Sequence, residues 1–265
     1  MTLGTGDRTI EAIVFDLDDV LVPFHTVQAW QWAWRPQGPI LGERHLLTAV
    51  RRSLHAWDRR RWEGVTGKAP PTDLEALRAH LAATLREIAG HAVAAEETEA
   101  VVRRMLRPAG EVERYPDVGP ALERLAQAKV KVGVVTPLPL ESARWLLHRV
   151  GIADDVLVGA GDPPGPCVPA RDAFRAVAAK LGVPLARCAL VGDLFWSDVR
   201  AAQRAGLTGI LLDRRGAWPH VSTGRITTLG ELEGAVVPGS GAGPSPPVGP
   251  SGAGTAGGRS SGTFL

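Results

Sequence analysis

The chain has 265 residues, of which 45% are hydrophobic, and its formal net charge at pH 7 is +2. This length suffices for one large domain or two modest ones with a proper core. The nearly balanced charge argues against a nucleic-acid or membrane-surface partner, and no segment is long enough to span a membrane. Residues 1–8 lack the apolar run of a secretion signal, and Cys167 and Cys188 fit neither a zinc site nor a disulfide framework. We therefore expect a soluble, cytoplasmic protein.

The first predicted strand, residues 11–17, ends in a group of acids. Its apolar, branched residues are typical of a buried parallel strand. Asp16, Asp18 and Asp19 then follow within four positions. Burying unpaired like charges is costly, and a hard cation such as Mg²⁺ would offset that cost. Because ligands bind beyond the carboxyl ends of strands in open α/β sheets, these acids indicate a site.

The next long segment, residues 25–107, is predicted to be helical. Leu46, Val50, Leu54 and Trp57 fall on one helical face, and a leucine stripe continues that spacing between residues 74 and 88. This block of about 80 residues has the usual size of a domain. We interpret it as an all-helical insertion.

Short helices and strands alternate in the rest of the core. Such alternation predicts a parallel sheet covered on both faces, that is, an α/β fold with a Rossmann-like core. The predicted helices are residues 121–128, 143–150, 174–181 and 198–205, and the predicted strands are residues 130–135, 156–158, 189–191 and 209–212.

These patterns predict three parts of the chain. Residues 1–22 and 110–237 form the α/β core, and residues 23–109 form the helical insertion after its first strand. Residues 238–265 are rich in Gly, Ser and Pro, and their low apolar content predicts a disordered tail.

A second acidic group follows the predicted strand at residues 189–191. Gly192 and Asp193 end that strand, and Asp198 lies five residues further on, at the expected start of a helix. An ordinary turn followed by a helix cap would give the same pattern. Together with Asp16 and Asp18, however, these acids predict one shared crevice at the carboxyl edge of the sheet.

At this point the chain resembles the haloacid dehalogenase-like (HAD) superfamily, in the phosphatase-rich branch with a helical cap. The resemblance covers roughly residues 12–212. The strand followed by Asp16-Leu17-Asp18 matches the first motif, Thr136 matches the second, and Gly192-Asp193 with Asp198 matches the fourth. The family's cap domain corresponds to the helical insertion.

The resemblance implies a role for each acid. Asp16 would be the nucleophile that forms an aspartyl-phosphate, and Asp18 would protonate the leaving oxygen and then activate water. Mg²⁺ would bind Asp16, the backbone carbonyl of Asp18 and Asp193, with Asp198 orienting its neighbours. Thr136 and Asp19 would help to bind the substrate phosphate.

The third motif, a lysine, is absent. The family alignment places it at Val168, and Arg171 is the nearest cation along the chain. Such a lysine counters the acids and the phosphate. Either Arg171 binds the phosphate in its place, or no cation does and the activity is weak.

The insertion is also rich in tryptophan and arginine. Trp57 and Trp62 flank Arg59-Arg60-Arg61, and Trp30, Trp32 and Trp34 alternate. These residues could clamp an anionic substrate, but we favour core tryptophans beside a solvated basic face.

We therefore predict a Mg²⁺-dependent hydrolase of a small-molecule phosphate ester. The alternatives are a catalytically weak HAD-like protein that binds a ligand or partner through its cap, and a dehalogenase, which would have little use for Asp18.

Overall fold

A computed structural model describes most of the chain. The described residues are 3–5, 8–23, 27–34, 43–68, 74–106, 113–153, 155–160, 171–222 and 224–232. None of the helices in these ranges is long and apolar enough to cross a membrane. The predicted tail, residues 238–265, and Val168 lie outside the described residues.

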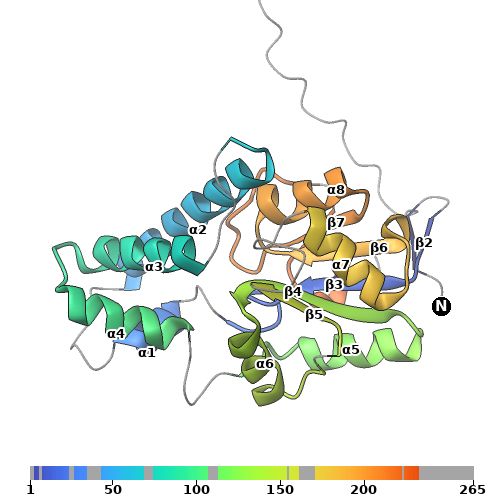
Figure 1. The fold of residues 1–265 in the computed structure, drawn as a ribbon, viewed down its shortest axis with the longest axis horizontal. Helices are drawn as coiled ribbons and strands as arrows, with labels where there is room; N and C mark the ends of the chain where they lie inside the picture. The colour runs from blue at the N-terminus through green and yellow to red at the C-terminus, as the bar shows by residue number, and fades with distance from the viewer. Residues whose placement is uncertain are drawn as a thin grey trace, which may run out of the picture.

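A six-stranded parallel sheet forms the centre of the molecule (Figure 1). Its strands stand in the order β5-β4-β3-β6-β7-β8. The bounds are β3 (Ala12–Asp16), β4 (Lys131–Pro139), β5 (Leu157–Ala160), β6 (Cys188–Gly192), β7 (Thr208–Leu212) and β8 (Arg225–Ile226). This topology confirms the predicted α/β class with a Rossmann-like core.

The strand that we expected to be first is the third in chain order. An antiparallel pair, β1 (Leu3–Thr5) and β2 (Arg8–Ile10), precedes it. The predicted strand itself is shorter than expected and ends at Asp16, where the backbone turns away from the sheet.

Both faces of β3 are buried, which explains its continuous apolar sequence. Ile13 and Phe15 pack on one side, in the cluster that contains residues of α5 and α6. Ala12 and Val14 pack on the other side, with Phe174 of α7. The helices that follow the insertion are α5 (Val118–Gln127), α6 (Leu140–Arg149), α7 (Arg171–Leu181) and α8 (Ala201–Ala205).

Two predicted element boundaries were wrong. The strand expected at residues 130–135 continues to Pro139, so Thr136 lies inside β4 rather than at its end; the pairing register with β5 shifts between Val135 and Pro139. Asp198 does not begin a helix but lies inside a π-helical turn, Phe195–Arg200, which leads into α8. π-Helical turns are rare and often occur at functional sites.

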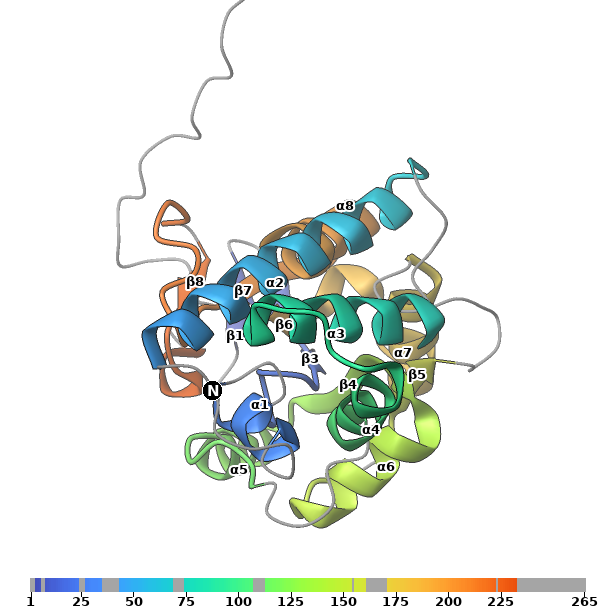
Figure 2. The ribbon, with the colours of Figure 1, turned by 90° about the vertical axis from the view of Figure 1, so that its left-hand side faces the viewer.

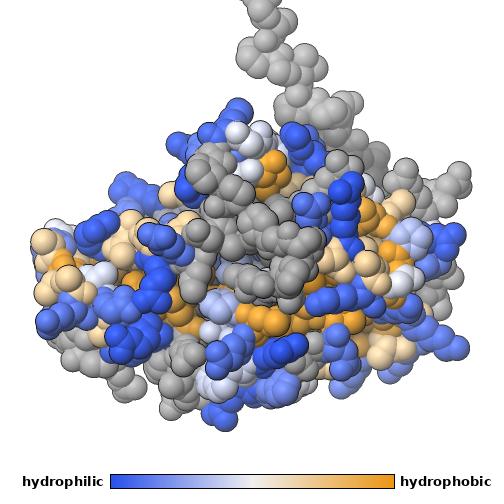
Figure 3. Space-filling model, viewed as in Figure 1, coloured by the Kyte–Doolittle hydropathy of each residue, from blue (hydrophilic) through white to orange (hydrophobic). Residues whose placement is uncertain are grey.

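Between β3 and α5, the described residues form four helices, which lie together at one end of the molecule (Figure 1). They are α1 (Val27–Trp34), α2 (Glu43–Val65), α3 (Leu74–Ala89) and α4 (Ala95–Leu106). On the face in Figure 3, hydrophilic side chains cover much of this end, and hydrophobic ones gather toward the middle of the view.

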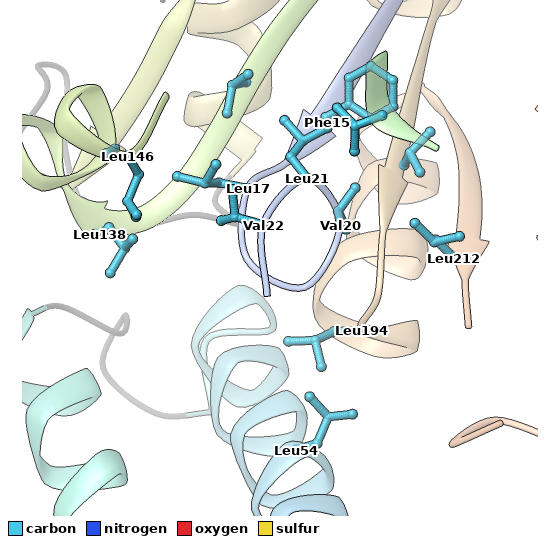
Figure 4. Close-up of a cluster of buried hydrophobic side chains, with 14 of the residues drawn as sticks. Phe15, Leu17, Val20, Leu21, Val22, Leu54, Leu138, Leu146, Leu194 and Leu212 are labelled. Atoms are coloured by element: carbon cyan, nitrogen blue, oxygen red, sulfur yellow. The ribbon is translucent and has the colours of Figure 1, made fainter. Parts of the chain in front are cut away.

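The longest helix, α2, contacts both its neighbours in the insertion and the α/β core. Toward α3, the Trp57 ring stacks on His80 with centroids 4.7 Å apart. Toward the core, Leu54 faces Leu194, directly before the π-helical turn (Figure 4). Figure 2 shows α2 along the side of the molecule where that turn leads into α8. Residues of α2 can therefore reach the carboxyl edge of the sheet.

Candidate active site at the carboxyl edge of the sheet

Adjacent strands bring the two acidic groups together, as predicted. β3 and β6 are parallel neighbours, with Phe15 opposite Val191, so both strands end at the same edge. Carboxylate oxygens of Asp16, Asp193 and Asp198 lie within 4.8 Å of one another. We call these three residues the acidic cluster.

The loop after β3 folds back tightly and holds its acids in place. The backbone N–H groups of Leu21 and Val22 both donate to the carbonyl oxygen of Leu17, at 3.1 and 3.2 Å. The side chains of Val20, Leu21 and Val22, which belong to this loop, are buried (Figure 4). Asp19 has φ of +58°, a conformation that Asp tolerates better than most residues.

Asp18 lies beside Thr136. The hydroxyl of Thr136 donates to Asp18 Oδ2 at 3.0 Å and accepts the backbone N–H of Leu138 at 3.2 Å. Both side chains are buried. Thr136, which we assigned to the substrate phosphate, thus orients Asp18 in this structure.

The turn after β6 presses Asp198 against the sheet. A Cβ at Gly192 would lie 2.5 Å from the Cβ of Asp198, so only glycine allows this approach. The backbone N–H of Leu194 donates to Asp198 Oδ2 at 3.1 Å. Asp198 therefore belongs to the acidic cluster itself, whereas the sequence predicted that it would only orient the residues of the cluster.

Helix α2 contributes a buried cation, Arg61, to this cluster. Its Nη2 lies 3.1 Å from Asp198 Oδ1, and the residue is 2% exposed. One turn earlier, Asp58 accepts the backbone N–H groups of Trp196 and Ser197 at 3.1 and 2.7 Å. These contacts fix α2 against the π-helical turn.

A second cation comes from the loop after β7. Arg215 Nη2 lies 2.5 Å from Asp19 Oδ2. Asp213 organises the loop by accepting the backbone N–H groups of Ala217 and Trp218, at 2.7 and 3.0 Å. The indole N–H of Trp218 then donates to the carbonyl oxygen of Asp193 at 2.9 Å.

These cations change what the sequence predicted for the charge of the site. The preferred interpretation of Arg59-Arg60-Arg61 as a solvated face was wrong for Arg61, although Arg59 is exposed. The available signal was the spacing of Asp58 and Arg61, which places both on one face of a helix. Arg171 begins α7, but its side chain lies outside the described structure.

The tryptophans of the insertion, which we expected in its core, lie there only in part. Trp30 and Trp57 are buried in the core of the insertion, as expected, and the side chain of Trp32 lies outside the described structure. Trp62 instead lies against Trp196 of the π-helical turn, with ring centroids 5.7 Å apart.

Burial makes the carboxylates hard to ionise. Burial and the neighbouring charges of Asp198 and Asp18 raise the pKa of Asp16 well above its ordinary value. Burial also raises the pKa of Asp193, with Asp19 adding to the effect. The pKa of Asp18 rises to about 7 and that of Asp198 to about 6, mainly through burial, which Arg61 opposes in each case.

These shifts predict that the metal-free protein becomes less stable as pH rises. A raised pKa means that the folded state binds more protons than the unfolded chain, so the stability present below about pH 4 is lost as pH rises through the folded pKa values. For Asp198 and Asp18 that loss falls between about pH 4 and 7. Thermal melts in a chelator should show a falling midpoint from pH 5 to 8, and Asp193→Asn should flatten the slope. A midpoint that rises over this range in both proteins would contradict the prediction.

The donor set fits a hard divalent cation. The cluster offers only carboxylate oxygens, the ligands that Mg²⁺ prefers. Asp16 Oδ1 and Asp18 Oδ1 are buried without a hydrogen-bond partner, and a bound cation would satisfy such an atom at Asp16.

This fold and this acidic centre define an α/β protein with a buried cluster of carboxylates at the carboxyl edge of its sheet. The model of a hydrolase family, the haloacid dehalogenase-like hydrolases, matches residues 10–206. The chain belongs to this family.

Known relatives agree with this assignment. The chain is 31% identical over 236 residues to Phosphatase MT3486 of Mycobacterium tuberculosis (strain CDC 1551 / Oshkosh), covering 88% of this chain and 99% of that protein. Its fold is similar to that of the defluorinating L-2-haloacid dehalogenase Rha0230, with a TM-score of 0.63, 19% identity and coverage of 89% and 99% of the two chains. It is also similar to a predicted phosphoglycolate phosphatase from Haemophilus somnus 129pt, with a TM-score of 0.58, 18% identity and coverage of 84% and 96%. At these identities the solved structures inform on fold alone.

Proposed function

We propose that this protein is a Mg²⁺-dependent phosphatase of small phosphate esters that acts through an aspartyl-phosphate on Asp16. The observation that carries this proposal is Asp18. It is buried, it accepts a hydrogen bond from Thr136, and its pKa rises to about 7, where a group can both donate and accept a proton at neutral pH. A hydrolase that releases an alkoxide leaving group needs such a residue beside its nucleophile.

The chain's own residues divide the work as follows. Asp16 attacks phosphorus, and the leaving oxygen takes a proton from Asp18. Asp18 then removes a proton from a water molecule that hydrolyses the aspartyl-phosphate and regenerates Asp16. Asp16, Asp193 and the backbone carbonyl of Asp18 would hold Mg²⁺, which when bound offsets the repulsion between the nucleophile and the phosphate.

The relative named as a phosphatase supports this choice, because its similarity extends over nearly its whole length. The family description, haloacid dehalogenase-like hydrolase, makes halide release the second candidate. Asp18 argues against it, since displacement of a halide needs no proton on the leaving group.

The test is product release by the purified protein from a panel of small phosphate esters and from 2-chloropropionate. We expect orthophosphate release with Mg²⁺, loss of that activity in a chelator, and no halide release. Halide release that is independent of metal would overturn the proposal. Release of neither product, with a phosphate ester still bound in calorimetry, would favour the ligand-binding alternative.

A further inference from the structure

The family lysine is absent at Val168, yet the acidic cluster has a cation of different origin. Arg61 comes from α2, in the helical insertion, and its guanidinium is buried against Asp198. The charges of Asp198, Asp16, Asp58 and Asp193 outweigh the burial of Arg61 and raise its pKa, so it stays protonated. This cation therefore enters the site from the insertion, whereas Arg215, which pairs with Asp19, comes from a loop of the core.

The hydrogen bonding of Arg61 is incomplete. Its Nε and Nη2 are buried and have no hydrogen-bond partner, although Nη2 lies at ion-pair distance from Asp198. Buried donors without acceptors are unfavourable, and a guanidinium fork matches the oxygens of a phosphate. An anion that enters the cluster would find in Nε and Nη2 two donors that lack a hydrogen-bond acceptor.

The position of Arg61 is fixed by contacts on the same face of α2. Asp58 binds two backbone N–H groups of the π-helical turn, and Arg51 donates to the carbonyl oxygen of Arg215 at 3.1 Å. The ring of His55 packs edge-on against Trp218, with centroids 4.5 Å apart. Because these contacts span about two turns of α2, the helix forms a fixed wall of the site.

We propose that Arg61 takes the place of the missing lysine: it neutralises the acidic cluster through its ion pair with Asp198 and donates to the substrate phosphate through Nε and the remaining hydrogen-bonding capacity of Nη2. This inference rests on the proposed function for the identity of the anion. It predicts opposite changes in the affinities for Mg²⁺ and for phosphate when Arg61 is replaced. Loss of the positive charge should strengthen binding of Mg²⁺ to the acids and weaken binding of phosphate. A merely structural arginine would weaken both.

The experiment measures Mg²⁺ and inorganic phosphate binding by calorimetry at pH 8 in wild type, Arg61→Met and Arg61→Lys. For Arg61→Met we expect about tenfold tighter Mg²⁺ binding, and phosphate binding in saturating Mg²⁺ weaker by about tenfold or more. Arg61→Lys retains the charge, so its Mg²⁺ affinity should stay near that of wild type while phosphate binding weakens. Arg59→Met, an exposed change on the same helix, is the matched control and should alter neither.

Arg61→Met with unchanged affinities, or with both affinities lowered, would overturn the inference. If Arg61→Met does not fold, Arg61→Gln is measured in its place, with the same opposite changes expected. The proposed function can fail separately from this inference. If the protein releases no orthophosphate from any ester, the phosphatase proposal is refuted. If Arg61→Met nevertheless binds Mg²⁺ more tightly and phosphate more weakly, the role of Arg61 in anion binding is retained.

Discussion

Replacing Asp16 by Asn should abolish hydrolysis and, in the absence of metal, make the protein more stable. The amide lacks the negative charge with which Asp16 would attack phosphorus, and loss of a nucleophile of this kind should lower the rate at least about a thousandfold. The same change removes a buried charge that Asp198 and Asp18 repel. The thermal midpoint in a chelator at pH 8 should therefore rise.

The measurements are steady-state phosphate release and thermal melts with and without Mg²⁺. The rise in midpoint that Mg²⁺ produces in wild type should shrink in Asp16→Asn, because one charged ligand is gone. Asp155→Asn, which changes an exposed acid, should match wild type in both measurements. If Asp16→Asn keeps more than about a tenth of the wild-type rate, Asp16 is not the nucleophile.

The second large effect is expected at Asp58, the contact between α2 and the π-helical turn. Asp58→Ala leaves the backbone N–H groups of Trp196 and Ser197 without their acceptor in a buried interface. Each such donor costs about 1–3 kcal/mol, so the free energy of unfolding should fall by about 2–6 kcal/mol. Phosphate release should fall as well, because Asp58 lies one helical turn from Arg61.

Hydrogen exchange separates this local effect from general destabilisation. In Asp58→Ala the amide hydrogens of Trp196 and Ser197 should exchange faster through local opening. Those of β3 exchange only through global unfolding, so their rates should follow the global stability of the variant. Asp58→Asn retains one acceptor oxygen and should be intermediate. Arg59→Ala, on the same helix, is the control. Unchanged exchange at residues 196 and 197 in Asp58→Ala would show that Asp58 does not hold the turn.

The proposed Mg²⁺ dependence and the proposed role of Arg61 are linked through Asp198. Arg61 and a bound cation both neutralise the same carboxylates, so each should reduce the need for the other. The three clustered carboxylates carry enough negative charge for a buried arginine and a metal ion to share them. Phosphate, which attracts both cations, is the ligand that would complete the charge balance.

Five of the six strands of the parallel sheet, and the meeting of Asp16 with Asp193, could be predicted from the sequence alone. The short strand β8 and the close approach of Asp198 could not. Continuous apolar runs such as Ala12–Phe15 identify buried parallel strands, and acids placed directly after two of them must meet at one edge. Such patterns involve only residues that are close in sequence, and in a parallel sheet they place the acids at one edge. The α/β class, the helices of the insertion and the approach of Asp16 to Asp193 therefore followed from the chain alone.

Only the tertiary structure decided which cations reach that edge. Arg61 lies 137 positions before Asp198 along the chain, and its arginine neighbours Arg59 and Arg60 are not buried. Which member of such a run turns inward depends on how α2 docks on the π-helical turn, and that turn forms only because Gly192 and Gly209 let it approach the sheet. Arg215 likewise reaches Asp19 because Asp213 folds its loop. Long-range packing of this kind has no periodicity, so the charge balance of the site could not be obtained from the pattern of residues.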